Sequence, residues 1–288
     1  GDEGLNGLGV LINSSYRQSL LEHILNYKVV RNKHDFNLTA VHAFDEQYAI
    51  YNQIDKSDFV NDALNFNGLA SKILSNYRSV TRRRVLSYLG RVRYAFDDKI
   101  LFEGTMRADG ASVFAENQKW GYFPAGSLAF KLDKILQNLD LEQLKLRLSY
   151  GSTGNQGINP LESLGVANYN PYTFGSSVVS GSSSSTRLRN PNLKWETTNT
   201  LNIGFDFGLF NNRLNGVVDL YQSNTIDLLL DISLLSSTGY SVTRFNVGEL
   251  ENKGAELTLN SLLVQGNNFS WDVGLMWSTN KNTIKALT

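Results

Sequence analysis

Leu201-Asn202-Ile203-Gly204-Phe205-Asp206-Phe207-Gly208-Leu209 is the stretch that decides the fold class, because its side chains alternate strictly in polarity. Every second residue is leucine, isoleucine or phenylalanine, and the residues between them are asparagine, glycine or aspartate. Successive side chains of a β-strand point to opposite faces. The stretch therefore predicts a strand with one apolar face and one polar face.

The same alternation recurs along the chain and predicts an all-β protein, an antiparallel meander of about eleven strands. The expected strands cover 5–15, 19–30, 34–47, 83–96, 99–109, 121–132, 143–151, 197–210, 213–230, 252–264 and 268–281. Several of them exceed the ~5–6 residues that are usual in globular sheets. Long strands with one wholly apolar face are typical of a sheet that crosses a bilayer, where each strand needs ~9–11 residues.

The connections between these strands alternate between short and long. Short turns are expected at Asn32-Lys33, Asp97-Asp98, Asn211-Asn212 and Gly266-Asn267, where the residue types favour tight turns. Long connections are expected at 48–82, 110–120, 152–196 and 231–251, and a short helical or irregular one at 133–142. Transmembrane β-barrels have this alternation, with tight periplasmic turns and long outer loops.

The composition excludes several classes of function. Lys+Arg and Asp+Glu both number 27, so the chain has no excess of positive charge with which to bind nucleic acid. The absence of cysteine excludes disulfides, thiolate metal sites and cysteine nucleophiles. No segment approaches the ~18–20 apolar residues of a membrane helix, and Gly1-Asp2-Glu3-Gly4 does not resemble the start of a signal peptide.

The polar faces of the predicted strands carry charges of both signs. They are Arg91, Arg93, Glu103, Arg107, Lys145, Arg147, Asp206, Asp219, Glu256 and Asp272. In a soluble protein such a face would be solvated, whereas in a membrane barrel it must line the lumen, because charge on the lipid face is costly.

Three other patterns resemble catalytic or binding sites, and each has a simpler explanation. Gly151 to Gly157 resembles a phosphate-binding loop but lacks the Lys-Ser/Thr pair and a following helix. His23, His34 and His42 have no carboxylate at ligand spacing, which favours surface or packing roles.

The third pattern consists of the acidic residues that could form a glycosidase pair. Asp97-Asp98 is better explained as a hairpin turn, and Asp109 as the ion-pair partner of Arg107 on the same strand face. No catalytic residue, metal or cofactor is therefore predicted, and the protein is not expected to be an enzyme.

Aromatic residues gather towards the ends of the predicted strands. Examples are Phe96, Phe102, Tyr122, Phe123, Phe210, Tyr221, Phe269 and Trp277. This distribution favours an aromatic girdle at the membrane interfaces, although strands also favour aromatics intrinsically. The loop aromatics Tyr169, Tyr172, Phe174 and Trp195 could stack on sugars or peptides, but loop packing is the expected role of each.

Several stretches, in shared order across about 86–260, resemble the SusC/RagA family of outer-membrane importers. They are Leu86 to Tyr94, Arg107 to Ser112, Lys119 to Pro124, Leu146 to Gln156, Asn190 to Thr198, Asn202 to Leu214, Asn246 to Gly248 and Asn252 to Leu259. Residues 1–85 resemble the family more weakly.

The resemblance implies a 22-stranded transmembrane barrel in the outer membrane of Bacteroidetes, with an N-terminal plug and energy supplied through TonB. Family members work with a SusD-like lipoprotein and import oligosaccharides or peptides. Residues 1–288 are accordingly expected to be a partial barrel domain, with the plug and the C-terminal strands absent, surrounded by outer-membrane lipid. The motifs are mainly signatures of barrel construction, so substrate-binding residues remain unknown.

Two other functions fit parts of the pattern. A soluble cell-surface β-sandwich adhesin that binds carbohydrate would have polar exposed faces and would be stable without detergent. An enzyme would need a convergent acid/base or nucleophile set, which the sequence does not contain.

Overall fold

The computed structural model describes residues 7–59, 70–136, 142–160, 162–163, 168–174, 177–183 and 187–287. The strands are β1 (Leu8–Arg31), β2 (His34–Phe59), β3 (Ala70–Phe96), β4 (Ile100–Ala111), β5 (Trp120–Lys131), β6 (Gln143–Asn155), β7 (Asn168–Phe174), β8 (Ser177–Ser183), β9 (Arg187–Leu188), β10 (Glu196–Leu209), β11 (Leu214–Ile226), β12 (Leu229–Ser233), β13 (Val242–Asn246), β14 (Glu249–Gln265) and β15 (Ser270–Ala286). The helical turns are η2 (Glu116–Gln118), α1 (Leu132–Ile135) and η3 (Ser236–Thr238).

The main sheet has ten strands in the order β1-β2-β3-β4-β5-β6-β10-β11-β14-β15. Strands that follow one another in the chain lie next to one another, which confirms the predicted all-β meander. The small sheets β12-β13-β9 and β7-β8 come from the long connections. Within the described residues, no helix is both long enough and apolar enough to cross a membrane.

Contacts divide the chain into two compact units, one made of Gly1–Leu21 and Phe44–Val85 and the other of Glu22–Ala43 and Leu86–Thr288. The second unit contains the ten charged residues expected on the polar face.

The first unit corrects two sequence predictions. The strands expected at 5–15 and 19–30 belong to the single strand β1, so the sheet has ten strands in place of about eleven. The polar residues between them do not end the strand, because Gln18 donates a hydrogen bond to Asp45 of β2 at 2.8 Å.

The long connection expected at 48–82 is also wrong, because β2 continues to Phe59 and β3 begins at Ala70. In β2, Tyr51 donates to Gln53 at 2.6 Å and Gln53 donates to Asp55 at 3.0 Å, each two residues along the strand. Glu46, which lies on the opposite face of β2, pairs with Arg84. Polar side chains therefore occupy both faces of this part of the strand, which leaves no hydrophobic period for the sequence pattern to reveal.

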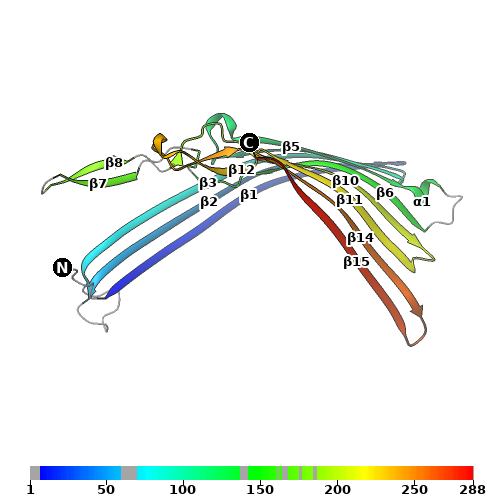
Figure 1. Cartoon of the computed structure of the whole chain (residues 1–288). Coiled ribbons are helices and arrows are strands. Elements are labelled where there is room, and N and C mark those ends of the chain that lie inside the picture. Colours follow the sequence, from blue (N-terminus) through cyan, green and yellow to red (C-terminus); the bar gives the residue numbers. More distant parts are fainter. Residues whose placement is uncertain are drawn as a thin grey trace. The chain divides into compact units, whose positions relative to one another are not determined.

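In the second unit the short turns gather at one end of the sheet. Figure 1 shows α1, the β10–β11 turn and the β14–β15 turn at this end. Asn32-Lys33 forms a two-residue turn, as predicted, whereas the turn at Asp97-Asp98 also includes Lys99. Asp97 and Asp98 have φ of 50° and 51°, in the left-handed region that aspartate and asparagine tolerate.

The strand registers align residues of like polarity across the sheet. Leu148 of β6 lies opposite Ile203 of β10, which lies opposite Leu220 of β11. These three side chains are 43%, 45% and 52% exposed, so the apolar face is open to its surroundings. Buried apolar residues occur instead among the connections of the opposite end, as in Val113 and Leu193.

The turn from Phe210 to Arg213 offers a test of the fold, because Phe210, Asn211 and Asn212 have φ of 60°, 57° and 56°. We expect Asn211→Val to destabilise the protein by about 1–2 kcal/mol, because a β-branched residue is strained in the left-handed region. The measurement is the urea unfolding midpoint of the full-length protein in lipid bilayers. Asn211→Gly is the control and should unfold at the same urea concentration as the wild type, because glycine adopts the left-handed region without strain. A valine variant as stable as the wild type would contradict this turn geometry.

Candidate functional site: the charged wall of the sheet

The face opposite the apolar one carries the predicted charges, and we call it the charged wall. It is defined by Arg91, Arg93, Glu103, Arg107, Lys145, Arg147, Asp206, Asp219, Glu256 and Asp272. Register places them together: Lys145 lies opposite Asp206, and Asp219 lies opposite Glu256. Arg93 reaches Glu103 across the β3–β4 hairpin at 3.1 Å.

Arg147 is the centre of the largest ion-pair group on this wall. Its guanidinium lies 2.7 Å from Asp206 and 3.2 Å from Asp219, so it joins β6 to β10 and β11. It can cross β10 because residue 204 is glycine: a Cβ there would lie 2.5 Å from the Arg147 Cζ. The carboxylates are only 15% and 21% exposed, which shields the pairs partly from solvent screening.

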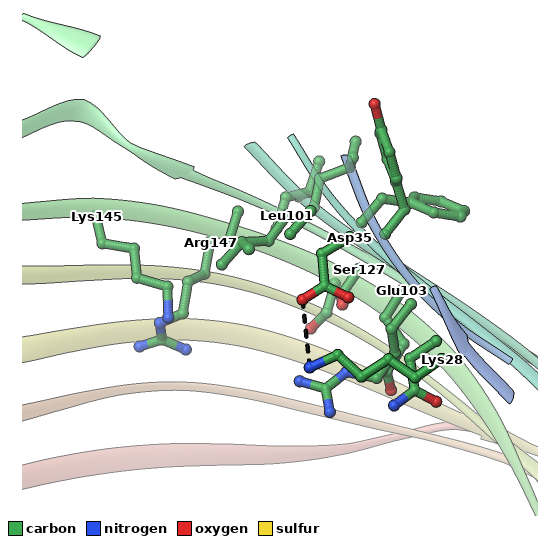
Figure 2. Close-up of a pocket in the computed structure, with 16 residues that line it drawn as sticks. Lys28, Asp35, Leu101, Glu103, Ser127, Lys145 and Arg147 are labelled. Carbon is green, nitrogen blue, oxygen red and sulfur yellow. Dashed lines mark ion pairs between the residues drawn. The ribbon is translucent and has the colours of Figure 1, made fainter. Parts of the chain in front are cut away.

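A polar cavity of about 490 Å³ lies over β1 to β6 on the charged wall. Figure 2 shows Lys145 and Arg147 on one side of it and Lys28, Asp35, Glu103 and Ser127 on the other. Lys28 and Asp35 are 3.5 Å apart. A cavity with fixed charges of both signs and hydroxyl groups can bind water or a polar solute through hydrogen bonds.

Asp109 forms the predicted ion pair with Arg107, at 2.7 Å. Asp109 is buried, and Arg107 also donates to Ser87 at 3.3 Å. This carboxylate is therefore fully engaged in a structural contact.

Asp97 and Asp98 are also engaged, by lysines at the turn. Hydrogen bonds from Lys131 and then Lys134 hold the pKa of Asp98 below its usual range, and a hydrogen bond from Lys99 does the same to the pKa of Asp97. A general acid needs a raised pKa, so neither residue has the character of a glycosidase acid.

The histidines occupy packing positions. His34 hydrogen-bonds the Tyr94 hydroxyl at 2.8 Å, and His23 and His42 stack with ring centroids 5.5 Å apart. Among the described residues, no group of three or more His, Cys, Asp or Glu side chains is arranged to hold a metal ion.

The glycine-rich run that resembles a phosphate loop has a different structure. Residues 151–155 continue strand β6, and Thr153 lies opposite Thr198 of β10. The Gly157 N–H donates to the side chain of Asn155 at 3.1 Å. The run therefore forms its hydrogen bonds with β10 and with Asn155 and does not form a phosphate-binding loop.

Sequence reasoning missed a packed cluster at the end of the sheet away from the short turns. Trp195 lies at its centre, 5.2 Å from Phe114 and 5.5 Å from Phe123 between ring centroids. Its Nε1–H donates to the Lys119 carbonyl at 3.0 Å, which confirms the packing role expected for this loop aromatic. Trp195 lies within Asn190 to Thr198, a stretch that resembles the SusC/RagA family. That resemblance is the sequence signal that could have indicated the cluster.

The predicted aromatic girdle needs two corrections. Phe123 is 7% exposed within the Trp195 cluster. Tyr221 lies opposite Gly254, two residues along from the Asp219–Glu256 pair, so it belongs to the charged wall. The side chains of Tyr169, Tyr172 and Phe174 lie outside the described residues.

An ion-pair network next to this cluster was also missed. Arg244 lies 2.7 Å from Glu162 and 2.8 Å from Asp231, and Arg187 lies 2.8 Å from Asp231. Hydrogen bonds from Arg187 and then Arg244 hold the pKa of Asp231 far below its usual range. These four residues come from two connections, β6–β10 and β11–β14, that are far apart in the sequence, so their spacing does not reveal them as partners.

Residues 2–286 match the family described as TonB dependent receptor-like, beta-barrel. The chain belongs to the TonB-dependent receptor β-barrel family. This membership assigns the sheet to an outer-membrane barrel, and thus the apolar face to lipid and the charged wall to the lumen.

Two curated relatives illustrate the similarity. TonB-dependent receptor P26 of Formosa agariphila is 38% identical over 233 residues, which are 78% of this chain and 23% of that protein. TonB-dependent receptor SusC of Bacteroides thetaiotaomicron is 37% identical over 227 residues, 76% of this chain and 22% of that protein. Both support the SusC/RagA resemblance and the predicted origin in Bacteroidetes.

The solved structure described as the RagAB peptide transporter has the same fold. It superposes with a TM-score of 0.87 at 28% identity, and the match covers 97% of this chain and 32% of that chain. The chain therefore spans about a quarter to a third of the length of these relatives.

The bridging role of Arg147 can be tested with a double-mutant cycle. We expect Arg147→Met and Asp219→Asn to show a coupling energy of about 0.2–1 kcal/mol, the range for partly exposed pairs. In a Gly204→Ala background the coupling should vanish, because the new methyl group displaces the guanidinium. The measurement is urea unfolding of the full-length protein in bilayers. Gly274→Ala, which adds a methyl group to the same wall, should leave the coupling intact.

The Asp231 network should hold its loops together at neutral pH. We expect Asp231→Asn to speed hydrogen exchange several-fold in β13, while exchange in β11 stays unchanged. The folded-state pKa of Asp231 is lowered, so the ionised carboxylate stabilises the fold. This stabilisation is fully present above about pH 3.9, the ordinary pKa of aspartate, and is lost as the pH falls below that value. The wild type should therefore approach the variant in acid. Equal exchange in β13 at neutral pH would contradict the network.

Proposed function

We propose that the intact protein imports nutrients, oligosaccharides or peptides, across the outer membrane with energy from TonB. Residues 1–288 contribute part of one barrel domain to that protein. The observation that supports this most is the combination of an exposed apolar face with a charged, cavity-bearing opposite face in a chain of the TonB-dependent receptor family.

We further propose a SusD-like lipoprotein as the partner on the cell surface. The support is similarity to SusC and to RagA of the RagAB peptide transporter. The Trp195 cluster gives the outer loops a packed base, which suits a surface that binds a second protein. TonB itself would be engaged through a part of the protein other than the strands described.

A peptide substrate is supported by the match to the RagAB peptide transporter. An oligosaccharide remains the alternative substrate, because the cavity lined by Ser127, Ser149 and charged groups suits hydroxyl-rich solutes equally well.

We also propose that the protein is not an enzyme. The carboxylates that could form an acid/base pair are occupied: Asp109 by Arg107, Asp98 by Lys131 and Lys134, and Asp206 by Arg147. The soluble adhesin is disfavoured by a face on which Leu148, Ile203 and Leu220 are about half exposed, since such a face is unstable in water.

The test uses the full-length protein, tagged and extracted with detergent from the outer membrane of its host. We expect a lipoprotein to co-purify, and deletion of the gene to abolish growth on one class of nutrient, either peptides or one glycan. Restoring the gene should restore growth, whereas a version lacking its TonB-contacting segment should not.

Two outcomes would contradict the proposal. One is a full-length protein that stays soluble without detergent, which would favour the adhesin. The other is an outer-membrane protein whose deletion leaves uptake of every tested peptide and glycan unchanged.

A further inference from the structure

The lipid-facing side of the sheet carries a groove of about 580 Å³ across β1 to β4. Three small residues form its floor on neighbouring strands, namely Ala40, Gly90 and Ala108. Leu25 and Met106 form its sides and are 70% and 48% exposed. A Cβ added at Gly90 would meet no atom within 4 Å, so the space above this residue is open.

A row of rings borders the groove on the side away from the short turns. The ring of His42 stacks on that of His23 at 5.5 Å between centroids and lies 5.2 Å from that of Tyr88, which lies 6.2 Å from that of Trp120. The absence of a side chain at Gly110 lets Trp120 lie over β4, since a Cβ there would be 3.0 Å from its ring.

A second group of rings lies nearer the Asn32 turn. The rings of Phe36 and Tyr94 are 4.6 Å apart, and His34 contacts both Tyr94 and Phe96. Phe36 and His42 are six residues apart on β2, which corresponds to about 20 Å along a strand. The groove thus begins beside the outer row of rings and extends into the apolar band between the two groups, as expected for interfacial aromatics.

The histidine pair adds a ring N–H donor to the donors that tyrosine and tryptophan supply in an aromatic girdle. The Nδ1 atoms of His23 and His42 are 3.2 Å apart, so the N–H of one ring donates a hydrogen bond and the Nδ1 of the other ring accepts it. The accepting ring, when neutral, carries its own proton on Nε2. The pair therefore presents at least one N–H donor at the edge of the lipid face, and a phosphate oxygen can accept a hydrogen bond from it.

We propose that this groove is a specific lipid site, which takes one acyl chain of a phosphate-bearing lipid of the outer leaflet with the phosphate at His23 and His42. Shape alone gives little selectivity in a bilayer, because lipid tails are as apolar as the groove. The contact with the headgroup therefore provides the specificity for the lipid, and the open space over Gly90 determines where its acyl chain lies. This inference depends on the membrane location of the sheet and is independent of the transported nutrient.

The test is native mass spectrometry of the detergent-purified full-length protein, with added diphosphoryl lipid A or its dephosphorylated form. We expect the wild type to bind one molecule of the phosphorylated lipid. Gly90→Leu should weaken this binding at least tenfold, because the new side chain fills the groove. Gly126→Leu is the matched control on the same face, where a Cβ makes only an ordinary contact of 3.7 Å.

The histidines are tested separately. The double variant His23→Gln and His42→Gln should weaken binding of phosphorylated lipid and leave the dephosphorylated form unaffected. Heat-modifiable migration on gels verifies that each variant folds. Equal lipid binding by the wild type and Gly90→Leu would overturn the proposal, and so would a Gly90→Leu variant that changes only the oligomeric state, because the groove would then be a protein interface.

Discussion

Backbone hydrogen bonding in a medium without water is the constraint on which the rest of this structure depends. A peptide group inside a bilayer must find its partner within the protein. The chain meets this requirement with continuous antiparallel ladders, such as the thirteen residue pairs from Thr197–Ile226 to Leu209–Leu214 between β10 and β11. Once every strand is paired in this way, side chains have only two faces to occupy.

The division into two faces explains both the chemistry and the location of the buried core. Apolar side chains lie on the lipid face and remain exposed in the isolated chain, as Ile203 does. Charged side chains must find partners on the other face, which is why Arg147 spans three strands to join Asp206 and Asp219. Close packing of the usual kind is found around Trp195, where loops leave the sheet and can fold on one another.

Sequence analysis predicted the part of the fold that follows from period two. The strand at 197–210 was placed within one residue of β10 at either end, and the Arg107–Asp109 pair followed from two positions on one strand. It failed where polarity stops alternating, as in β2 beyond residue 47, because hydrogen-bonded polar residues on both faces resemble a loop. It also failed for Asp231, Arg244 and Glu162, whose proximity depends on how separate loops fold.

The central claim is that alternate residues of one strand face lipid and water, and cysteine labelling in intact cells tests it most directly. The measurement compares Ile203→Cys with Asn202→Cys in an otherwise cysteine-free version of the full-length protein. The account predicts that a membrane-impermeant, water-soluble maleimide labels position 202, whereas position 203 reacts only with a lipid-soluble maleimide. Equal labelling of both positions by the water-soluble reagent would contradict the account.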